Sequence, residues 1–417
     1  MLSRPFIILY ASVFVATMGI SMVSPVLPVY AEELGATGIW IGATFSVFAV
    51  TQTIFGPPIG RLSDKYGRKW FIVAGLLIYF VAAMGYLTAG TFIQVFIFRA
   101  ISGLGTACIF AVARAYVGDM VPPGREGRWF GMFATADIVG FGVGPLVAGV
   151  IREFFGFEAV FVSMAFIMIS TGGFVTFLLP PQSRARAGWE GRAADISFVL
   201  AMKNRLVIAL TLVMGLISVT FGATFSFLAV LLEERLLIGP ALIGIAFSMA
   251  SLSAGLAQPF FGRMADRFNR RLLVSLGLAA SAVALLGIGT VPPYWVMLGL
   301  LLLMGIGEAV SMVSASAMQV VAGRFVGMGT VIGLGAAGQG IGIVFGGVAA
   351  GSLVDGFGLE AAFVFSGLSM LLGIIPFVVL TAGQPTRDEE VLLRPDGGLE
   401  ASPHPRPLGA TGDGEAE

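Results

Sequence analysis

Long apolar stretches separated by short polar segments run along almost the whole chain. The stretches fall at about 5–31, 39–59, 70–88, 92–117, 129–150 and 158–180, and then at 206–232, 240–261, 272–291, 295–319, 328–350 and 360–381. Most of them reach the ~20 residues that a helix needs to cross ~30 Å of hydrocarbon. The pattern therefore predicts an all-α membrane protein with twelve transmembrane helices in two sets of six.

A repeat with a constant offset of 202 residues relates the two sets. The string GRLSDKYGRK at residues 60–69 returns as GRMADRFNRR at residues 262–271, and the same offset carries Glu32 onto Glu234. Because the offset holds from residue 32 to residue 363, the duplication covers a whole half of the chain. It predicts two pseudo-symmetric six-helix bundles with matched loops.

The polar segments then divide the chain into four parts. Residues 1–181 are expected to form the N-terminal bundle and residues 206–382 the C-terminal bundle. Residues 182–205, which contain Pro and Arg, are expected to form a cytoplasmic linker. Residues 383–417 are rich in Pro, Gly and acidic residues, which predicts a disordered cytoplasmic tail.

The amino-acid composition reduces the number of functions that the chain can have. Hydrophobic residues make up 57% of the chain and charged residues 12%, against about 25% charged in soluble domains. A net charge of zero gives no reason to expect nucleic acid as a partner. Cys108 is the single cysteine and His404, in the tail, the single histidine, so histidine-based triads and zinc sites are excluded from the spans. We expect no enzyme activity, metal or cofactor, and the sequence has no P-loop through which ATP could drive a cycle.

The distribution of Arg and Lys predicts the orientation. These cations gather in the segments that join spans 2 to 3, 4 to 5, 6 to 7, 8 to 9 and 10 to 11, whereas the opposite side has Arg152 and Arg235. Cytoplasmic loops hold the excess of positive charge. We therefore expect a multi-pass protein of the cell membrane with both termini in the cytoplasm. The first span, with its interior Pro25 and Pro28, is expected to be a retained helix and not a signal peptide.

The repeated string at residues 60–69 carries the first recognisable motif. We expect a tight turn in which Gly60 and Gly67 permit positive φ. Asp64 can accept hydrogen bonds from the amides of a helix N-terminus, and Arg68 can hold its carboxylate. This pattern resembles the signature loop between helices 2 and 3 of the major facilitator superfamily. The resemblance implies a cytoplasmic latch that stabilises the outward-open state by bridging the two halves.

The resemblance extends the latch to helix 4 and to the second half. The family pairs the first latch with an acid at the end of helix 4, which here matches Asp119. The second copy supplies Gly262, Asp266 and Arg270. It has Asn269 where the first has Gly67, and Val321 in place of Asp119. The role of the second latch therefore stays open.

Span 5 carries a second motif, formed by Gly140, Gly144, Pro145 and Gly149. Glycines four residues apart leave a smooth groove for a neighbouring helix, and Pro145 frees a carbonyl and bends the helix. The motif is similar to the helix 5 motif of drug/proton antiporters within the superfamily. Span 4 (RAISGLG) and the end of span 1 (SPVLPVYAEELG) resemble the same group.

Three ionisable residues lie inside predicted spans: Arg99, Asp137 and Glu308. Such residues are functional candidates because charges in lipid are costly. Their predicted depths allow Arg99 to pair with Asp137, and Gln339, the repeat counterpart of Asp137, could hydrogen-bond Glu308. One interpretation is that Asp137 or Glu308 exchanges a proton during transport. The other is a static ion pair, together with a permanently protonated Glu308 packed between helices.

These features lead to a hypothesis for function. We expect a secondary active transporter that exports amphiphilic small molecules in exchange for protons, as multidrug transporters do, by rocking two bundles around a midplane site. The alternative is transport of a polar metabolite such as a sugar or an organic acid. Some drug antiporters carry a helix 1 carboxylate for protons or cationic drugs, whereas spans 1 and 7 of this chain contain no acid, so the resemblance does not support a preference for cationic drugs. We expect a monomer in the lipid bilayer. The residues expected to face an apolar cavity are Met18, Met22, Phe110, Met214, Phe221, Phe225, Met304 and Met312.

Overall fold

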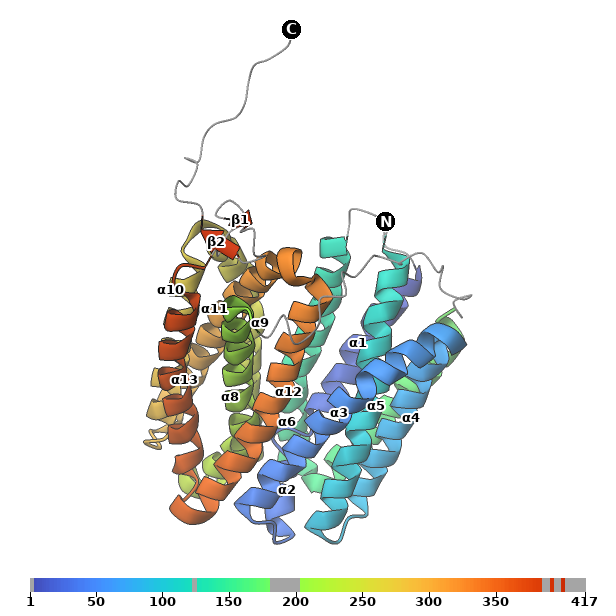
Figure 1. Cartoon of the computed structure of the whole chain (residues 1–417). Helices are drawn as coiled ribbons and strands as arrows, with labels where there is room; N and C mark the ends of the chain where they lie inside the picture. The colour runs from blue at the N-terminus through green and yellow to red at the C-terminus, as the bar shows by residue number, and fades with distance from the viewer. Residues whose placement is uncertain (1–3, 122–125, 181–202, 385–390, 394–398, 402–417) are drawn as a thin grey trace.

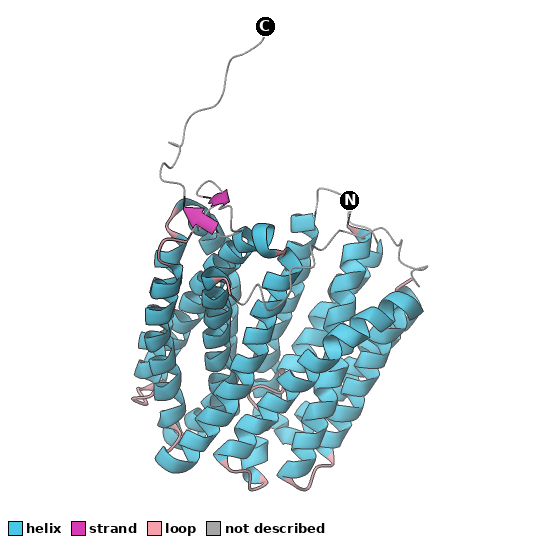
Figure 2. Ribbon diagram, in the orientation of Figure 1, coloured by secondary structure: helices cyan, strands magenta, loops and turns pink. Residues whose placement is uncertain are grey.

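Helices form nearly all of the described structure (Figure 2). The computed structural model describes residues 4–121, 126–180, 203–384, 391–393 and 399–401. The helices are α1 (Arg4–Ser21), α2 (Leu27–Glu33), α3 (Gly38–Tyr66), α4 (Arg68–Leu87), α5 (Phe92–Met120), α6 (Glu126–Leu178), α8 (Arg205–Leu236), α9 (Pro240–Arg267), α10 (Arg270–Ile288), α11 (Tyr294–Val326), α12 (Met328–Phe357) and α13 (Glu360–Thr381).

Within the described residues, eleven helices are long and apolar enough to cross a membrane. One of them, α6, has 53 residues, which corresponds to about 80 Å and is too long for one crossing. The chain reverses inside α6 at Gly156, where φ is 80° and ψ is −176°, a conformation that glycine adopts without steric cost. Counting α6 twice gives the twelve crossings that the sequence predicts. The short helix α2 follows the α1 crossing.

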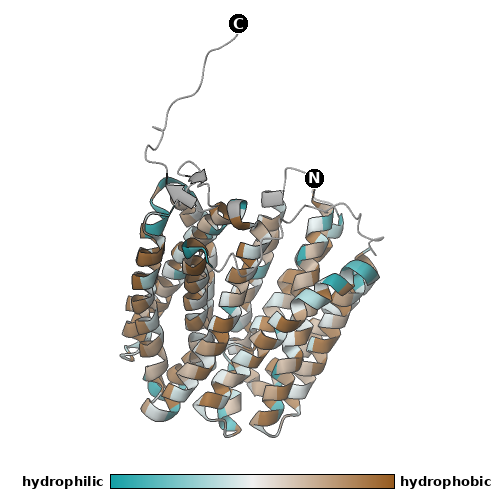
Figure 3. Cartoon of the chain, in the orientation of Figure 1, coloured by the Kyte–Doolittle hydropathy of each residue, from teal (hydrophilic) through white to brown (hydrophobic). Residues whose placement is uncertain are grey.

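The two ends of the molecule differ in charge. We call the end that carries the Gly60–Lys69 segment the basic end, and the opposite end, which carries Glu32, Glu33, Glu233 and Glu234, the acidic end. The basic end is at the top of Figure 1, where α1 begins and α13 ends, and the acidic end is at the bottom. Hydrophobic residues dominate the helices between the two ends (Figure 3).

The two halves meet through α3 with α12 and through α6 with α9. Glycine permits both contacts, since a Cβ atom on Gly42 would collide with the carbonyl group of Gly347, and one on Gly244 with the carbonyl oxygen of Pro145. The 202-residue offset maps the first contact onto the second. In Figure 1, α3 and α12 meet near the acidic end and diverge toward the basic end.

The predicted linker, 182–205, and the predicted tail, 383–417, fall largely outside the described residues. Within the tail the structure describes two short strands, β1 (Val391–Leu393) and β2 (Leu399–Ala401). They pair in antiparallel fashion, with Leu392 opposite Glu400.

Candidate functional site: a central cavity between the halves

A cavity with two lobes lies between the two halves. The carboxylate lobe, of about 380 Å³, is lined in part by Asp137 and Glu308. The arginine lobe, of about 710 Å³, is lined in part by Arg99 and Arg114. Residues shared by both linings are Asp137, Phe141, Phe221, Phe225, Gln339 and Ile343. The shared wall makes the two lobes parts of one cavity.

The cavity extends toward the basic end. The lining of the arginine lobe includes Arg114, near the end of α5, and Gly333, near the start of α12. Both helix ends lie at the basic end, whereas at the acidic end the halves are in contact. The structure therefore represents a conformation that is closed at the acidic end.

Glu308 lies on α11 and contributes to the carboxylate lobe. The predicted hydrogen bond from Gln339 to Glu308 is wrong, since among the described residues the Gln339 amide instead donates to Met214 Sδ, at 3.7 Å. Gln339 still lines both lobes. Met214 lies on α8, which packs closely against α12, and this packing explains why the amide turns toward it.

Asp137 has different partners from those the sequence predicts. Thr17 on α1 donates a hydrogen bond to its carboxylate at 3.1 Å, and Arg114 Nη2 lies 3.9 Å from the other carboxylate oxygen. The predicted Arg99–Asp137 pair is therefore wrong. Arg114, which the sequence reasoning passed over, lies within the predicted fourth span, and its place in an apolar stretch was the available signal.

Arg99 is 5% exposed and lies against aromatic rings. Its guanidinium carbon is 4.1 Å from the centre of the Phe48 ring and 5.0 Å from that of Phe45, which allows cation–π attraction. Its Nε and Nη1 atoms have no hydrogen-bond partner among the described residues. Arg99 is thus a buried cation at the wall of the cavity without a carboxylate beside it.

Aromatic rings form the wall that the two lobes share. Phe221 and Phe225 stack with ring centres 4.1 Å apart, and Phe141 lies 5.6 Å from Phe225. Phe141 was not predicted, although it follows Asp137 by one helical turn and so shares its face. The predicted cavity residues that do line it are Phe110, Phe221, Phe225, Met304 and Met312. Met22 and Met214 are instead buried in the core.

The first latch forms one cluster within the N-terminal half. Gly67 has φ of 94° and is the turn itself, whereas Gly60 lies inside α3, so the tight turn is shorter than predicted. Arg68 pairs with Asp64 at 2.8 Å and also donates to the Asp119 carboxylate. The structure brings these predicted residues together. In this conformation their contacts stay within one half.

The second latch has a different turn. Asn269 occupies the position of Gly67 in the first copy. It caps α10, because its side chain accepts hydrogen bonds from the backbone amides of Arg271 and Leu272. Arg270 lies 3.7 Å from Asp266 and donates to the Ala265 carbonyl at 3.1 Å. Gly262 lies inside α9. The second copy has Val321 in place of Asp119, and its Arg270 thus contacts a backbone carbonyl in addition to Asp266.

The span 5 motif packs in two directions. A Cβ atom at Gly140 would lie 2.5 Å from the Phe14 carbonyl oxygen of α1, and one at Gly144 would collide with Met18 of α1. Gly149 faces the other half instead, where a Cβ atom would collide with the Pro240 carbonyl of α9. The motif therefore supports packing within the first half and the contact between halves.

Twelve crossings in two related bundles, with a central cavity facing one end, define a membrane transporter. The chain belongs to the Major Facilitator Superfamily, whose profile it matches over residues 9–236 and 210–409. It is a multi-pass membrane transporter and not an enzyme.

Two relatives have similar sequences. An uncharacterised MFS-type transporter of Methanocaldococcus jannaschii is 25% identical over 382 residues, which cover 90% of this chain and 98% of that protein. The quinolone resistance protein NorA of Staphylococcus aureus is 26% identical over 301 residues, which cover 70% of this chain and 76% of NorA.

Solved structures share the fold. A bacterial homologue of the human lysosomal transporter Spinster, in an inward-facing and occupied conformation, matches with a TM-score of 0.73 and 15% identity, covering 91% of this chain and 96% of that one. The nucleoside transporter NupG matches with a TM-score of 0.77 and 14% identity, covering 91% of this chain and 99% of that one. These neighbours establish the fold alone.

Proposed function

We propose that the chain exports amphiphilic small molecules from the cell in exchange for protons. The observation that carries the proposal is the carboxylate lobe, where Asp137 from one half and Glu308 from the other line the same space as Phe141 and the stacked Phe221 and Phe225 rings. Apolar walls suit an amphiphile, and two carboxyls inside the membrane can bind protons. The similarity to a quinolone resistance protein supports drug efflux.

The mechanism follows from the position of the carboxyls between the halves. In the conformation described, a substrate enters the cavity from the basic end, which we place in the cytoplasm together with both termini. Rocking of the halves would then expose the cavity at the acidic end. Glu308 or Asp137 would bind a proton there and release it when the cavity faces the cytoplasm again, which gives antiport. A monomer suffices, because one chain supplies the whole cavity.

Arg99 favours a second candidate, export or uptake of an organic acid. Its buried Nε and Nη1 atoms lack partners among the described residues, and it lines the arginine lobe with Arg114. A buried donor without a partner is costly, and a substrate carboxylate would satisfy it.

A thermal-shift screen of the purified protein against hydrophobic drugs, sugars and carboxylates separates the two candidates. Export of amphiphiles predicts stabilisation by hydrophobic drugs in the wild type and in Arg99→Gln alike. Stabilisation by carboxylates alone, lost in Arg99→Gln, would establish the organic acid instead. A response limited to sugars would contradict both.

The latch role is tested by Asp64→Asn. If Asp64 binds the other half when the basic end closes, the substitution should favour the conformation open at that end. A helix-end charge contributes about 0.3 to 1 kcal/mol, so we expect labelling of Ala336→Cys, in the arginine lobe, to rise about 2- to 5-fold in a Cys108→Ala background. The control is Asp266→Asn, the repeat-equivalent acid of the second latch, for which we expect a smaller change. Equal labelling of Asp64→Asn and the wild type would reject the latch.

A further inference from the structure

The acidic end is held closed by carboxylates that cross between the halves. Asp355 on α12 accepts hydrogen bonds from the amides of Gly38, at 2.6 Å, and Ile39, at 3.0 Å, at the start of α3. Glu153 on α6 accepts one from the amide of Ala241, at 3.1 Å, at the start of α9. Each carboxylate thus satisfies free amides of a helix N-terminus in the opposite half.

These two contacts are equivalent under the sequence repeat. The offset of 202 residues carries Glu153 onto Asp355 and Ile39 onto Ala241. The two halves therefore close the acidic end with the same device on each side of a pseudo-twofold axis. Residues near such an axis meet their own repeat equivalents.

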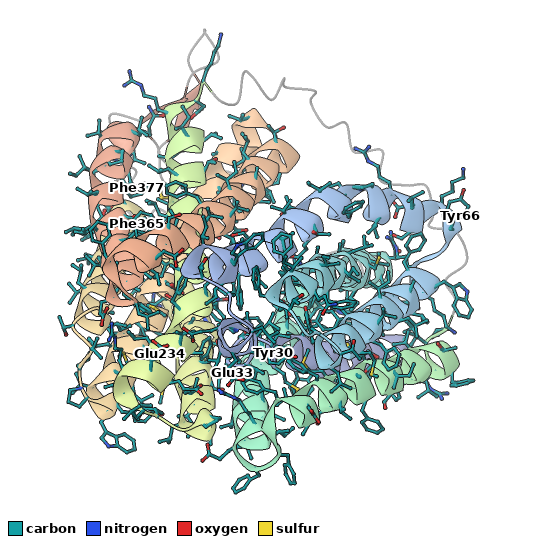
Figure 4. All side chains as sticks on the ribbon, turned by 90° about the horizontal axis from the view of Figure 1, so that it is seen from below. Tyr30, Glu33, Tyr66, Glu234, Phe365 and Phe377 are labelled. Carbon is teal, nitrogen blue, oxygen red and sulfur yellow. The ribbon has the colours of Figure 1, made fainter. Side chains whose placement is uncertain are left out.

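Glu32 and Glu234 are such a pair. They are 202 residues apart and lie on α2 and α8, which pack against each other across the halves and bring the two carboxyl groups close together. Two carboxyl groups hydrogen-bond only when one of them is protonated, because an ionised carboxylate only accepts. A hydrogen bond between Glu32 and Glu234 across the halves therefore requires one proton. Glu33 and Glu234 lie close to the line where the halves meet, as seen from the acidic end in Figure 4.

The surrounding charges do not replace this proton. Glu33 on α2 and Glu233 on α8 add negative charge near Glu32. Arg152 on α6 is bound to Glu233, with both N–O distances at 2.6 Å, and Arg235 lies 2.9 Å from Glu360. Each of these two arginines thus has another carboxylate as its partner.

We propose that Glu32 and Glu234 form a proton-binding site that holds the acidic end closed, and that loss of the shared proton opens this end. The site is separate from the cavity and regulates which conformation the empty transporter adopts. It does not depend on which substrate is exported.

The direction of the pH effect follows from Glu32. Burial, and then the neighbouring carboxylates of Glu234, Glu233 and Glu33, raise its pKa from 4.5 to about 7 in the closed state. When the halves separate, the carboxyl faces water and its pKa returns toward the ordinary value. The closed state therefore binds the proton more tightly, so closure is favoured as pH falls from about 7 toward 4.5 and is lost as pH rises through 7. Each unit of difference changes the ratio of closed to open about tenfold.

The test is a distance measurement without substrate. Spin labels at Ile93→Cys and Trp295→Cys, exposed repeat equivalents at the acidic end, report the separation of the halves in a Cys108→Ala background. We expect a short distance to dominate at about pH 5 and the ratio of short to long distances to fall at least about tenfold by about pH 8. Glu32→Gln, whose amide donates to Glu234 at any pH, should keep the short distance at both values.

Two further variants complete the test. Glu234→Lys replaces the shared proton with a fixed positive charge, so it should also stay closed at about pH 8. Glu158→Gln removes an exposed carboxyl at the same end and should behave as the wild type. A wild-type distance that ignores pH, or a Glu32→Gln or Glu234→Lys variant that still opens as pH rises, would overturn the proposal.

Discussion

Replacing Glu308 by Gln is expected to abolish proton-coupled transport while leaving the protein folded. Gln has nearly the same shape as Glu and stays neutral, so it occupies the same place in the carboxylate lobe without binding or releasing a proton. Among the described residues no salt bridge involves Glu308, so its loss leaves no buried cation behind. We expect the coupled transport rate to fall at least about tenfold, as it does when a proton-transferring group is removed.

Two control variants define the effect of Glu308→Gln. Glu308→Asp keeps a titratable carboxyl at the position and should retain part of the coupling. Glu158→Gln removes an exposed carboxyl outside the cavity and should change nothing. Unchanged coupling in Glu308→Gln would instead indicate that Asp137 carries the proton. The Asp137 carboxylate lies in the same lobe, between Thr17 and Arg114.

Gly347→Val is expected to prevent closure of the acidic end. A Cβ atom at Gly347 would lie 2.6 Å from Ser46 Oγ and 2.7 Å from the carbonyl oxygen of Gly42, across the contact between α12 and α3. Overpacking of this kind costs about 1 to 3 kcal/mol. Since the clash exists only when the end is closed, the ratio of closed to open should fall about 5- to 150-fold.

The same spin-label pair, Ile93 and Trp295, measures this shift at about pH 5, where the wild type is expected to be closed. Gly356→Val is the matched control, because Gly356 is on the same helix near the same end and a Cβ atom there would meet nothing within 4 Å. We expect the control to keep the short distance. A short distance in Gly347→Val as well would mean that the contact between α3 and α12 does not limit closure.

The fold could be predicted because the lengths of the apolar segments and the repeat can both be read directly from the sequence. Twelve crossings follow from segment lengths, and the repeat offset relates the observed contact of Gly42 with Gly347 to that of Gly244 with Pro145. Two of the predicted crossings lie within α6, and Gly156 marks the boundary between them.

The partners of Asp137 could not be predicted in the same way. Arg99 and Arg114 are both on α5, 15 residues apart, or about 22 Å along the axis. The predicted depths of Arg99 and Asp137 allow these two residues to pair, but depth does not fix the direction in which a side chain points. The rotation and tilt of α5 and α6 decide it, and they depend on packing across the whole half.

The acidic-end contacts were partly visible in the sequence. Glu32 and Glu234 are identical at equivalent positions, but nothing in a sequence says which equivalents touch across the axis. Glu153 and Asp355 differ in residue type, so a search for identical pairs misses them, although their shared carboxylate performs the same capping.

Proton flux in liposomes that contain only this protein tests most directly whether the transporter exchanges protons for an amphiphile. A pH-sensitive dye reports the lumen while an amphiphile identified by thermal shift is moved by its own gradient. If the protein is an antiporter, substrate moving in one direction drives protons in the other, and Glu308→Gln removes this flux. Substrate movement that neither drives protons nor responds to a proton gradient would contradict proton antiport.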